Sequence, residues 1–235
     1  MENYCLECVE NYKRVEERVR AAALKSGRAE DAVQLVAVTK TVAADAIAAV
    51  IEAGAGIIGE NRVQEMLSKK DDLAHLQKQT HIIGHLQSNK AKYLPGCVDM
   101  IQSIDSEKLG QAVSKAFAGA GACVDVLVEV NIGGEDSKSG CRPEEVEPLL
   151  YLLKDLPGIK VQGLMTIPPI CEGDEARAYF ARMYKLFIDM RQKNIDNINI
   201  NTLSMGMTGD FENAILEGAT MVRVGTGIFG KRIYA

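Results

Sequence analysis

The feature of this sequence that most restricts its fold is a repeated alternation of short apolar segments with helical ones. Short apolar runs bounded by turn residues are typical of strands that are buried on both faces. Because consecutive parallel strands need a crossover between them, usually a helix, this alternation predicts a parallel sheet. The expected strands cover residues 34–39, 57–58, 81–83, 100–102, 124–130, 160–165, 202–204 and 221–224.

The number of expected strands favours a closed barrel over an open sheet. A (β/α)8 barrel of the TIM type usually has about 250 residues, and this chain has 235. An open doubly wound sheet is the alternative, but the sequence contains no G-x-G-x-x-G after the first strand and no P-loop motif. Residues 3–25 predict an additional N-terminal helix. No linker composition divides the chain, so we expect residues 1–235 to form one α/β domain.

The charge and composition exclude several classes of function. Hydrophobic residues make up 47% of the chain and charged residues 25%, as in ordinary globular proteins. Lys and Arg number 27 against 32 Asp and Glu, with no long basic run, so we expect no nucleic-acid partner. No apolar stretch reaches the roughly 20 residues that a membrane helix needs. The acidic N-terminus does not resemble a signal peptide, which predicts a cytoplasmic protein.

The six cysteines do not form a pattern typical of a metal or disulfide site. Cys5 and Cys8 make a C-x-x-C pair, but this pair lies in the N-terminal helical pattern, and no second pair completes a zinc site. We therefore expect no metal and interpret the cysteines as reduced thiols of a cytosolic protein. They are Cys5, Cys8, Cys97, Cys123, Cys141 and Cys171.

Lys40 directly follows the apolar run Leu35–Thr39, at the end of the first expected strand. Loops at the carboxyl ends of barrel strands build the site. Partial burial there disfavours the ammonium form, lowers the pKa of a lysine and leaves a nucleophile for an aldehyde such as pyridoxal phosphate. The alternative interpretation is a lysine that only ends the strand and faces water.

Two glycine-rich turns at the end of the chain are candidates for a phosphate site. Ser204–Asp210 follows the seventh strand, and Gly225–Gly227 follows the eighth. In TIM-type barrels phosphate often binds in these two loops, where glycines let the backbone approach an anion and hydroxyls donate to it. Either turn alone would also suit an ordinary reversal of the chain. Lys231 and Arg232 would add positive potential nearby.

Arg223 lies within the otherwise apolar eighth strand, two residues before Gly225. One interpretation is a buried arginine paired with a carboxylate. The other is that Arg223 faces the ring nitrogen of a pyridoxal group spanning from Lys40 to the phosphate turns. Because arginine only donates hydrogen bonds, it would keep that nitrogen unprotonated and weaken the cofactor as an electron sink.

Seven motifs occur in order from Leu35 to Gly230 and together resemble one family, the pyridoxal phosphate homeostasis proteins of the YggS/PROSC type. They are Val36 to Lys40, Gly59 to Glu65, Ile83 to Lys90, Ser137 to Gly140, Gly163 to Thr166, Ser204 to Met207 and Arg223 to Gly230. The N-terminal helix carries no motif of this family.

The resemblance implies a single barrel related to the N-terminal domain of alanine racemase, a fold-type III barrel, with pyridoxal phosphate as cofactor. It implies a Schiff base on Lys40 and a ring nitrogen that faces Arg223. The residues that it implies for the phosphate are Ser204, Gly225 and Thr226, and Asn61 and Met205 are implied as further pocket members.

Comparison with the racemases leaves the question of catalysis open. They resemble this chain in the barrel, but add a C-terminal domain that delivers a catalytic tyrosine to a partner subunit, so we expect a monomer here. Ile167 stands where racemases look to carry a histidine against the ring. Racemisation requires a base on each face of the ring; Lys40 could be one, and the sequence offers no obvious second.

Three functions remain as hypotheses. The first is a carrier that holds pyridoxal phosphate on Lys40 without substantial turnover and supplies it to apoenzymes. The second is a pyridoxal-phosphate-dependent racemase, or a related enzyme, of low activity. The third is a Schiff-base aldolase that uses Lys40 without a cofactor. Lys138, in the loop after the fifth strand, could receive or release the aldehyde, although a solvated lysine would also explain it.

Overall fold

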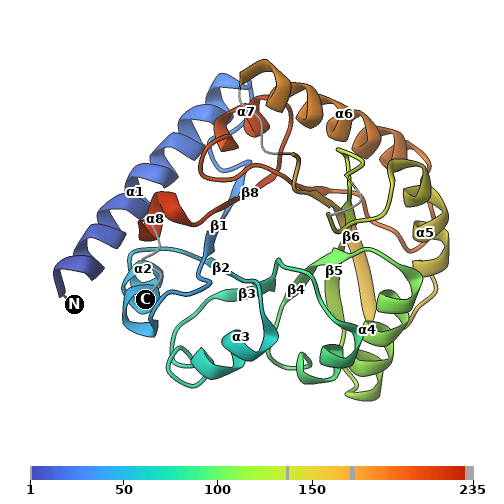
Figure 1. Ribbon diagram of the computed structural model, residues 1–235, viewed down its shortest axis with the longest axis horizontal. Helices are drawn as coiled ribbons and strands as arrows, with labels where there is room; N and C mark the ends of the chain where they lie inside the picture. Colours follow the sequence, from blue (N-terminus) through green and yellow to red (C-terminus); the bar gives the residue numbers. More distant parts are fainter. Residues whose placement is uncertain (1, 136–137, 170–172, 231–235) are drawn as a thin grey trace.

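The fold was analysed in a computed structural model that describes residues 2–135, 138–169 and 173–230. Its parallel strands close into a barrel in the order β1 to β8, with β1 paired to both β2 and β8 (Figure 1). The prediction of a (β/α)8 barrel with an N-terminal helix is thereby confirmed. The strands are β1 Gln34–Val38, β2 Ile57–Glu60, β3 Gln79–Ile82, β4 Met100–Ile104, β5 Val124–Val130, β6 Ile159–Thr166, β7 Thr202–Ser204 and β8 Met221–Val224.

Helices form a ring around these strands, as Figure 1 shows. One crossover differs from the others, because the segment that contains Lys90 and Lys92 is a 3-10 helix, η1, and not an α-helix. Pro95 follows shortly after it and cannot continue an α-helix, which keeps this segment short. The helices are α1 Glu2–Lys25, α2 Ala44–Glu52, α3 Val63–Lys69, η1 Ser88–Tyr93, α4 Glu107–Gly119, η2 Pro143–Glu145, α5 Val146–Leu153, α6 Gly173–Gln192, α7 Phe211–Leu216 and α8 Thr226–Phe229.

The N-terminal helix α1 packs against α2, α7 and α8, so the two ends of the described chain lie side by side (Figure 1). Tyr4 donates its hydroxyl proton to the carbonyl of Phe229 at 3.0 Å. Cys8 is buried in the core and Cys5 packs against it, so both members of the C-x-x-C pair contribute to hydrophobic packing. Among the described residues, no three His, Cys, Asp or Glu side chains cluster as metal ligands would.

Side chains from six strands form an apolar cluster inside the barrel. Its members are Val36, Ile57, Met100, Leu127, Met165 and Met221. Side chains alternate along a strand, so the residue two positions further on points to the same face. On the inner face of the barrel, Glu129 therefore follows Leu127 along β5, and Arg223 follows Met221 along β8. The interior therefore becomes polar toward the carboxyl ends of the strands, where the site lies.

Four of the positions named in the sequence analysis, Ser137, Cys171, Lys231 and Arg232, lie outside the described residues. Within the described ranges, no helix is both long enough and apolar enough to span a lipid bilayer.

Candidate functional site

A cavity of about 510 Å³ opens at the carboxyl ends of the strands. It brings together five of the seven predicted site residues, which come from the ends of β1, β2 and β8: Lys40, Asn61, Arg223, Gly225 and Thr226. The other described residues that line it are Val38, Ile83, Gly84, His85, Glu129, Lys138, Ser139, Ile167, Met207, Thr208 and Gly209. Residues more than 180 positions apart in the chain thus share one site, because closure of the barrel places β1 beside β8.

Lys40 is half-buried at the rim of this cavity, two residues after β1 ends. The preceding residue, Thr39, is fully buried, and its N–H donates to the carbonyl of Gly59 at 2.9 Å. The following residue, Thr41, has a positive φ of 62°. The lysine is therefore carried on a short turn between β1 and α2, rather than on the strand itself.

Arg223 lies inside the barrel and is almost completely buried. Its guanidinium donates to the hydroxyl oxygen of Ser204 at 2.6 Å and to the carbonyl oxygen of Thr166 at 2.9 Å. Burial lowers the pKa of Arg223 to about 10, while the charges of Glu129 and Asp210 act in the opposite direction. Arg223 is thus a fixed cation at neutral pH that forms part of the cavity wall.

A chain of buried hydrogen bonds extends from Arg223 across the barrel. The Ser204 hydroxyl donates to Gln102 Oε1 at 2.7 Å, and Gln102 Nε2 lies 3.0 Å from His81 Nδ1. Burial lowers the pKa of His81 to about 4, so its ring is neutral and Nδ1 can accept this bond. The chain satisfies polar groups from β3, β4, β7 and β8 and holds Arg223 in one orientation.

Two predicted site residues lie away from the cavity surface. Ser204 is fully buried beneath it, and its hydroxyl is engaged by Arg223 and Gln102. Met205 is buried in the core between barrel and helices, and its N–H donates to the carbonyl of Met221 at 3.1 Å. Neither is among the described residues that line the cavity. Their roles as cofactor contacts stay predictions.

Thr208 joins the two glycine-rich turns. Its hydroxyl oxygen accepts a hydrogen bond from the N–H of Gly227 and from the hydroxyl of Thr226, each at 3.2 Å. A Cβ atom added at Gly227 would lie 3.0 Å from a side-chain carbon of Val224 and 3.1 Å from one of Thr208, so a larger residue there would require these side chains to shift slightly. Gly225 is the N-cap of the short helix α8, which stands where the sequence predicted a glycine-rich turn.

Glu129 is a site residue that the sequence analysis did not select. It lines the cavity, is almost fully buried, and its Oε2 atom has no hydrogen-bond partner among the described residues. Its pKa is raised to about 7, mainly by burial and also by the charge of Asp105, while the charge of Arg223 acts in the opposite direction. A signal was present in the sequence, because Glu129 is a charged residue near the carboxyl end of the apolar strand Val124–Val130.

The raised pKa of Glu129 predicts a specific dependence of stability on pH. In the folded protein Glu129 retains a proton that it releases above its ordinary pKa of 4.5 in the unfolded chain. The contribution of Glu129 to the free energy of unfolding is therefore highest below pH 4.5 and is lost as the pH rises through 7. With a folded pKa of about 7, this one group lowers the free energy of unfolding by about 2 kcal/mol between pH 5 and pH 7.

Urea denaturation of the apo-protein at several pH values measures this effect. Glu129→Gln is the matched control, because it keeps the shape of the side chain but cannot ionise. We expect the difference in unfolding free energy between variant and wild type to change by about 2 kcal/mol over this range. A constant difference would contradict the assignment.

The donors around the cavity suit pyridoxal phosphate, the cofactor that the resemblance implies. The volume of the cavity lies within the range of about 300 to 1,000 Å³ that is typical of small-molecule sites. Lys40 offers an amine for the aldehyde, Arg223 a donor for the ring nitrogen, and Thr226 a hydroxyl for the phosphate. The Glu129 oxygen that has no hydrogen-bond partner among the described residues offers one further polar group to a bound molecule.

Comparison with known proteins shows the family of this chain. The model of the family described as alanine racemase, N-terminal domain, matches residues 11–232. A pyridoxal phosphate homeostasis protein from Aquifex aeolicus is 43% identical over 226 residues, which cover 96% of this chain and 98% of that protein. The corresponding protein from Pseudomonas aeruginosa is 41% identical, with 96% of both chains covered. This chain belongs to the pyridoxal phosphate homeostasis protein family.

Solved structures extend the comparison to the fold. PipY of Synechococcus elongatus, with pyridoxal phosphate bound, has a TM-score of 0.79 and 33% identity, covering 91% of this chain and 99% of PipY. A protein from Bifidobacterium adolescentis, described as unknown, has a TM-score of 0.92 and 38% identity, with 97% of both chains covered. Alanine racemase of Clostridium difficile, at 17% identity and a TM-score of 0.71, shares the fold over 57% of its own chain.

Proposed function

We propose that this protein binds pyridoxal 5'-phosphate reversibly, as a Schiff base on Lys40, and serves in the homeostasis of this cofactor. The observation that carries the proposal is the cavity of about 510 Å³, which is lined by Lys40 after the first strand and by Arg223 and Thr226 at the end of the last strand. The PipY relative with pyridoxal phosphate bound supports it. When bound, the cofactor supplies an aldehyde for the amine and an electron-accepting ring.

Each proposed role follows from the chemistry of the side chain. Lys40 supplies the amine, and Arg223 donates to the ring nitrogen and keeps it unprotonated. Gly225 and Thr226 hold the phosphate, together with Ser204 as predicted from the sequence, and Thr208 is an additional candidate because it joins both turns. Asn61 and Met205 are proposed as further pocket members.

A weakly active racemase is the second candidate, and Glu129 is the observation that favours it. Racemisation requires two groups that exchange a proton, and Glu129 is a titratable carboxyl with a pKa of about 7 in the same cavity as Lys40. Ile167 lines the cavity where racemases look to carry a histidine. Rapid interconversion of D- and L-alanine by the loaded protein would favour the racemase over the carrier.

Reduction with borohydride followed by peptide mapping tests the carrier and the site together. We expect purified protein incubated with pyridoxal phosphate to be yellow, and reduction to fix one phosphopyridoxyl group on the peptide that contains Lys40. A label on Lys138 would show that this lysine, and not Lys40, binds the aldehyde. Uptake of no label would contradict the proposed function, and would leave the cofactor-independent aldolase as the hypothesis to test.

The setting of this activity is also part of the proposal. We propose a single cofactor-binding domain of residues 1–235 that acts as a cytoplasmic monomer and delivers pyridoxal phosphate to apoenzymes. The five cysteines among the described residues are free thiols, which supports a reducing compartment.

A further inference from the structure

The backbone on both sides of Lys40 is held by charged side chains of the following β2–α3 unit. Lys69, the last residue of α3, donates from Nζ to the carbonyl oxygen of Thr39 at 2.8 Å. Glu65, one turn earlier on α3, accepts the N–H of Thr41 with Oε1. The residues immediately before and after Lys40 are therefore each bonded to the same short helix.

These contacts belong to a compact ionic network. The Lys69 amine also lies 2.8 Å from Glu60 Oε1 and 2.7 Å from Glu65 Oε1. The hydroxyl of Thr39 donates to the same oxygen of Glu60 at 2.7 Å. Only 13% of the Lys69 side chain and 2% of the Glu60 side chain are exposed, so water weakens these charge-assisted bonds little. Neither Lys69 nor Glu65 is among the described residues that line the cofactor cavity.

The turn that this network holds is strained. Thr41 has a φ of 62°, a left-handed conformation that is unfavourable for a β-branched residue. Such strain persists only where the surroundings over-determine it, and it concentrates at functional sites. Here it falls on the residue next to Lys40, and Glu65 holds the N–H of that residue. The turn is closed by its own hydrogen bond from the N–H of Val42 to the carbonyl of Thr39, and the network adds bonds from α3 on both sides of Lys40.

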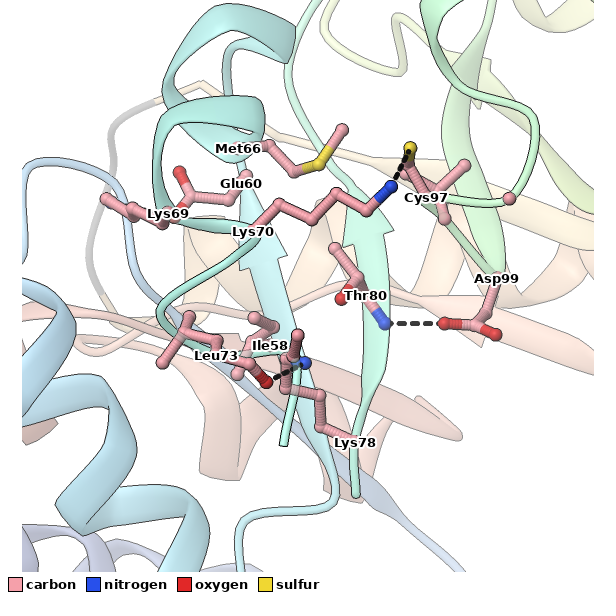
Figure 2. A pocket seen from close by; sticks show the side chains of 13 residues that line it. Ile58, Glu60, Met66, Lys69, Lys70, Leu73, Lys78, Thr80, Cys97 and Asp99 are labelled. Carbon is pink, nitrogen blue, oxygen red and sulfur yellow. Dashed lines mark hydrogen bonds and ion pairs between the residues drawn. The ribbon is translucent and has the colours of Figure 1, made fainter. Parts of the chain in front are cut away.

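Figure 2 shows the outer side of this network, where Glu60 and Lys69 line a separate cavity of about 390 Å³. Lys70 lines the same cavity but reaches in the other direction, so that its amine lies 3.3 Å from Cys97 Sγ. Two adjacent lysines at the end of α3 thus have different partners. Lys69 bonds to the turn that carries Lys40, whereas Lys70 contacts a loop before β4, and this makes Lys70 a matched control.

We propose that Lys69, together with Glu60 and Glu65, is a positioning residue for Lys40: it fixes the turn 39–41 and thereby the direction in which the Lys40 amine enters the cavity. This inference rests on the proposed role of Lys40 as the cofactor lysine. The ionic network then sets how tightly the cofactor is retained, without touching it.

Three variants measured with pyridoxal phosphate itself test the positioning role. Titration of apo-protein and dilution of loaded protein, both followed by visible absorbance, give the affinity and the release rate. We expect Lys69→Met to weaken binding or speed release roughly tenfold or more, because small misplacement of a reacting group is costly. Lys69→Arg, which restores a donor cation, should recover most of the effect, and Lys70→Met should match wild type.

A second measurement does not depend on the cofactor. Hydrogen exchange of the segment 39–42 in apo-protein should become faster in Lys69→Met, and in the milder Glu65→Gln variant, but not in Lys70→Met. Glu65 is partly exposed, so Glu65→Gln keeps the test valid even if Lys69→Met fails to fold.

The outcomes separate the two proposals. If wild type binds pyridoxal phosphate and Lys69→Met matches it in affinity, release and exchange, the positioning role is wrong while the proposed function stands. Equal losses in Lys69→Met and Lys70→Met would also overturn it, because they would reflect general loosening of α3. Wild type that binds no cofactor would refute the proposed function, and the exchange experiment would still decide whether Lys69 holds the turn.

Discussion

Lys40→Ala is expected to abolish the borohydride-reducible attachment of pyridoxal phosphate and the visible absorbance that accompanies it. Alanine has no amine, so no covalent bond to the aldehyde can form at this position. The contacts proposed at Arg223 and Thr226 remain, and cofactor should still bind weakly and reversibly to the variant. Absorbance spectra and the mass of the borohydride-reduced protein measure the covalent loss, and equilibrium dialysis measures what binding remains.

Lys138→Ala is the matched control for this experiment, because Lys138 is the other lysine among the described cavity-lining residues. Its amine contacts the carbonyl of Pro168 at 3.0 Å and Glu135 at 2.8 Å. We expect this variant to keep the colour and the label. If Lys40→Ala kept a full equivalent of label, or if Lys138→Ala lost the label, the proposed attachment of the cofactor to Lys40 would be wrong.

Arg223→Met should cost about 3–5 kcal/mol of the free energy of unfolding of the apo-protein, as is typical when one partner of a buried charged network is removed. Methionine fills most of the volume but leaves the Ser204 hydroxyl oxygen and the Thr166 carbonyl oxygen without their donor. It also removes the cation that lowers the pKa of Glu129, so this pKa should rise from its value of about 7. Urea denaturation measures the loss through the transition midpoint.

An exposed arginine provides the comparison. Arg177 bonds to Glu217 at 2.6 Å, but about half of its side chain is exposed to water. Pairs of this kind contribute about 0–1 kcal/mol, so Arg177→Met should shift the midpoint little. Similar losses in the two variants would show that Arg223 contributes no more than a surface arginine, and the buried network described above would not stabilise the barrel.

The fold could be predicted from the sequence because its signals are local. Each of the eight expected strands is found at its predicted place, since each is a short apolar run bounded by turn residues. The type of element in the structure differs from the predicted type in two segments. The segment before Pro95 is a 3-10 helix instead of an α-helix, and the turn after β8 is the short helix α8.

The site was predictable in part. Lys40, Asn61, Arg223, Gly225 and Thr226 were named from their motifs and line one cavity. Glu129 was missed because its neighbours in sequence are apolar, and its raised pKa results from burial among groups of other strands. Ser204 was placed at the phosphate from its motif, but whether its side chain faces the cavity or Arg223 is decided by β4 and β8.

The sequence by itself determined the order of the strands and helices, the family and the identity of most of the residues at the mouth of the barrel. Only the tertiary structure decided which groups share an environment. Examples are the hydrogen-bonded chain from Arg223 to His81, the Glu129 oxygen that has no partner among the described residues, and the contact of Lys69 with the turn at Lys40. The physical reason is that apolar periodicity acts over a few neighbouring residues, whereas desolvation and hydrogen bonding depend on side chains that only closure of the barrel brings together.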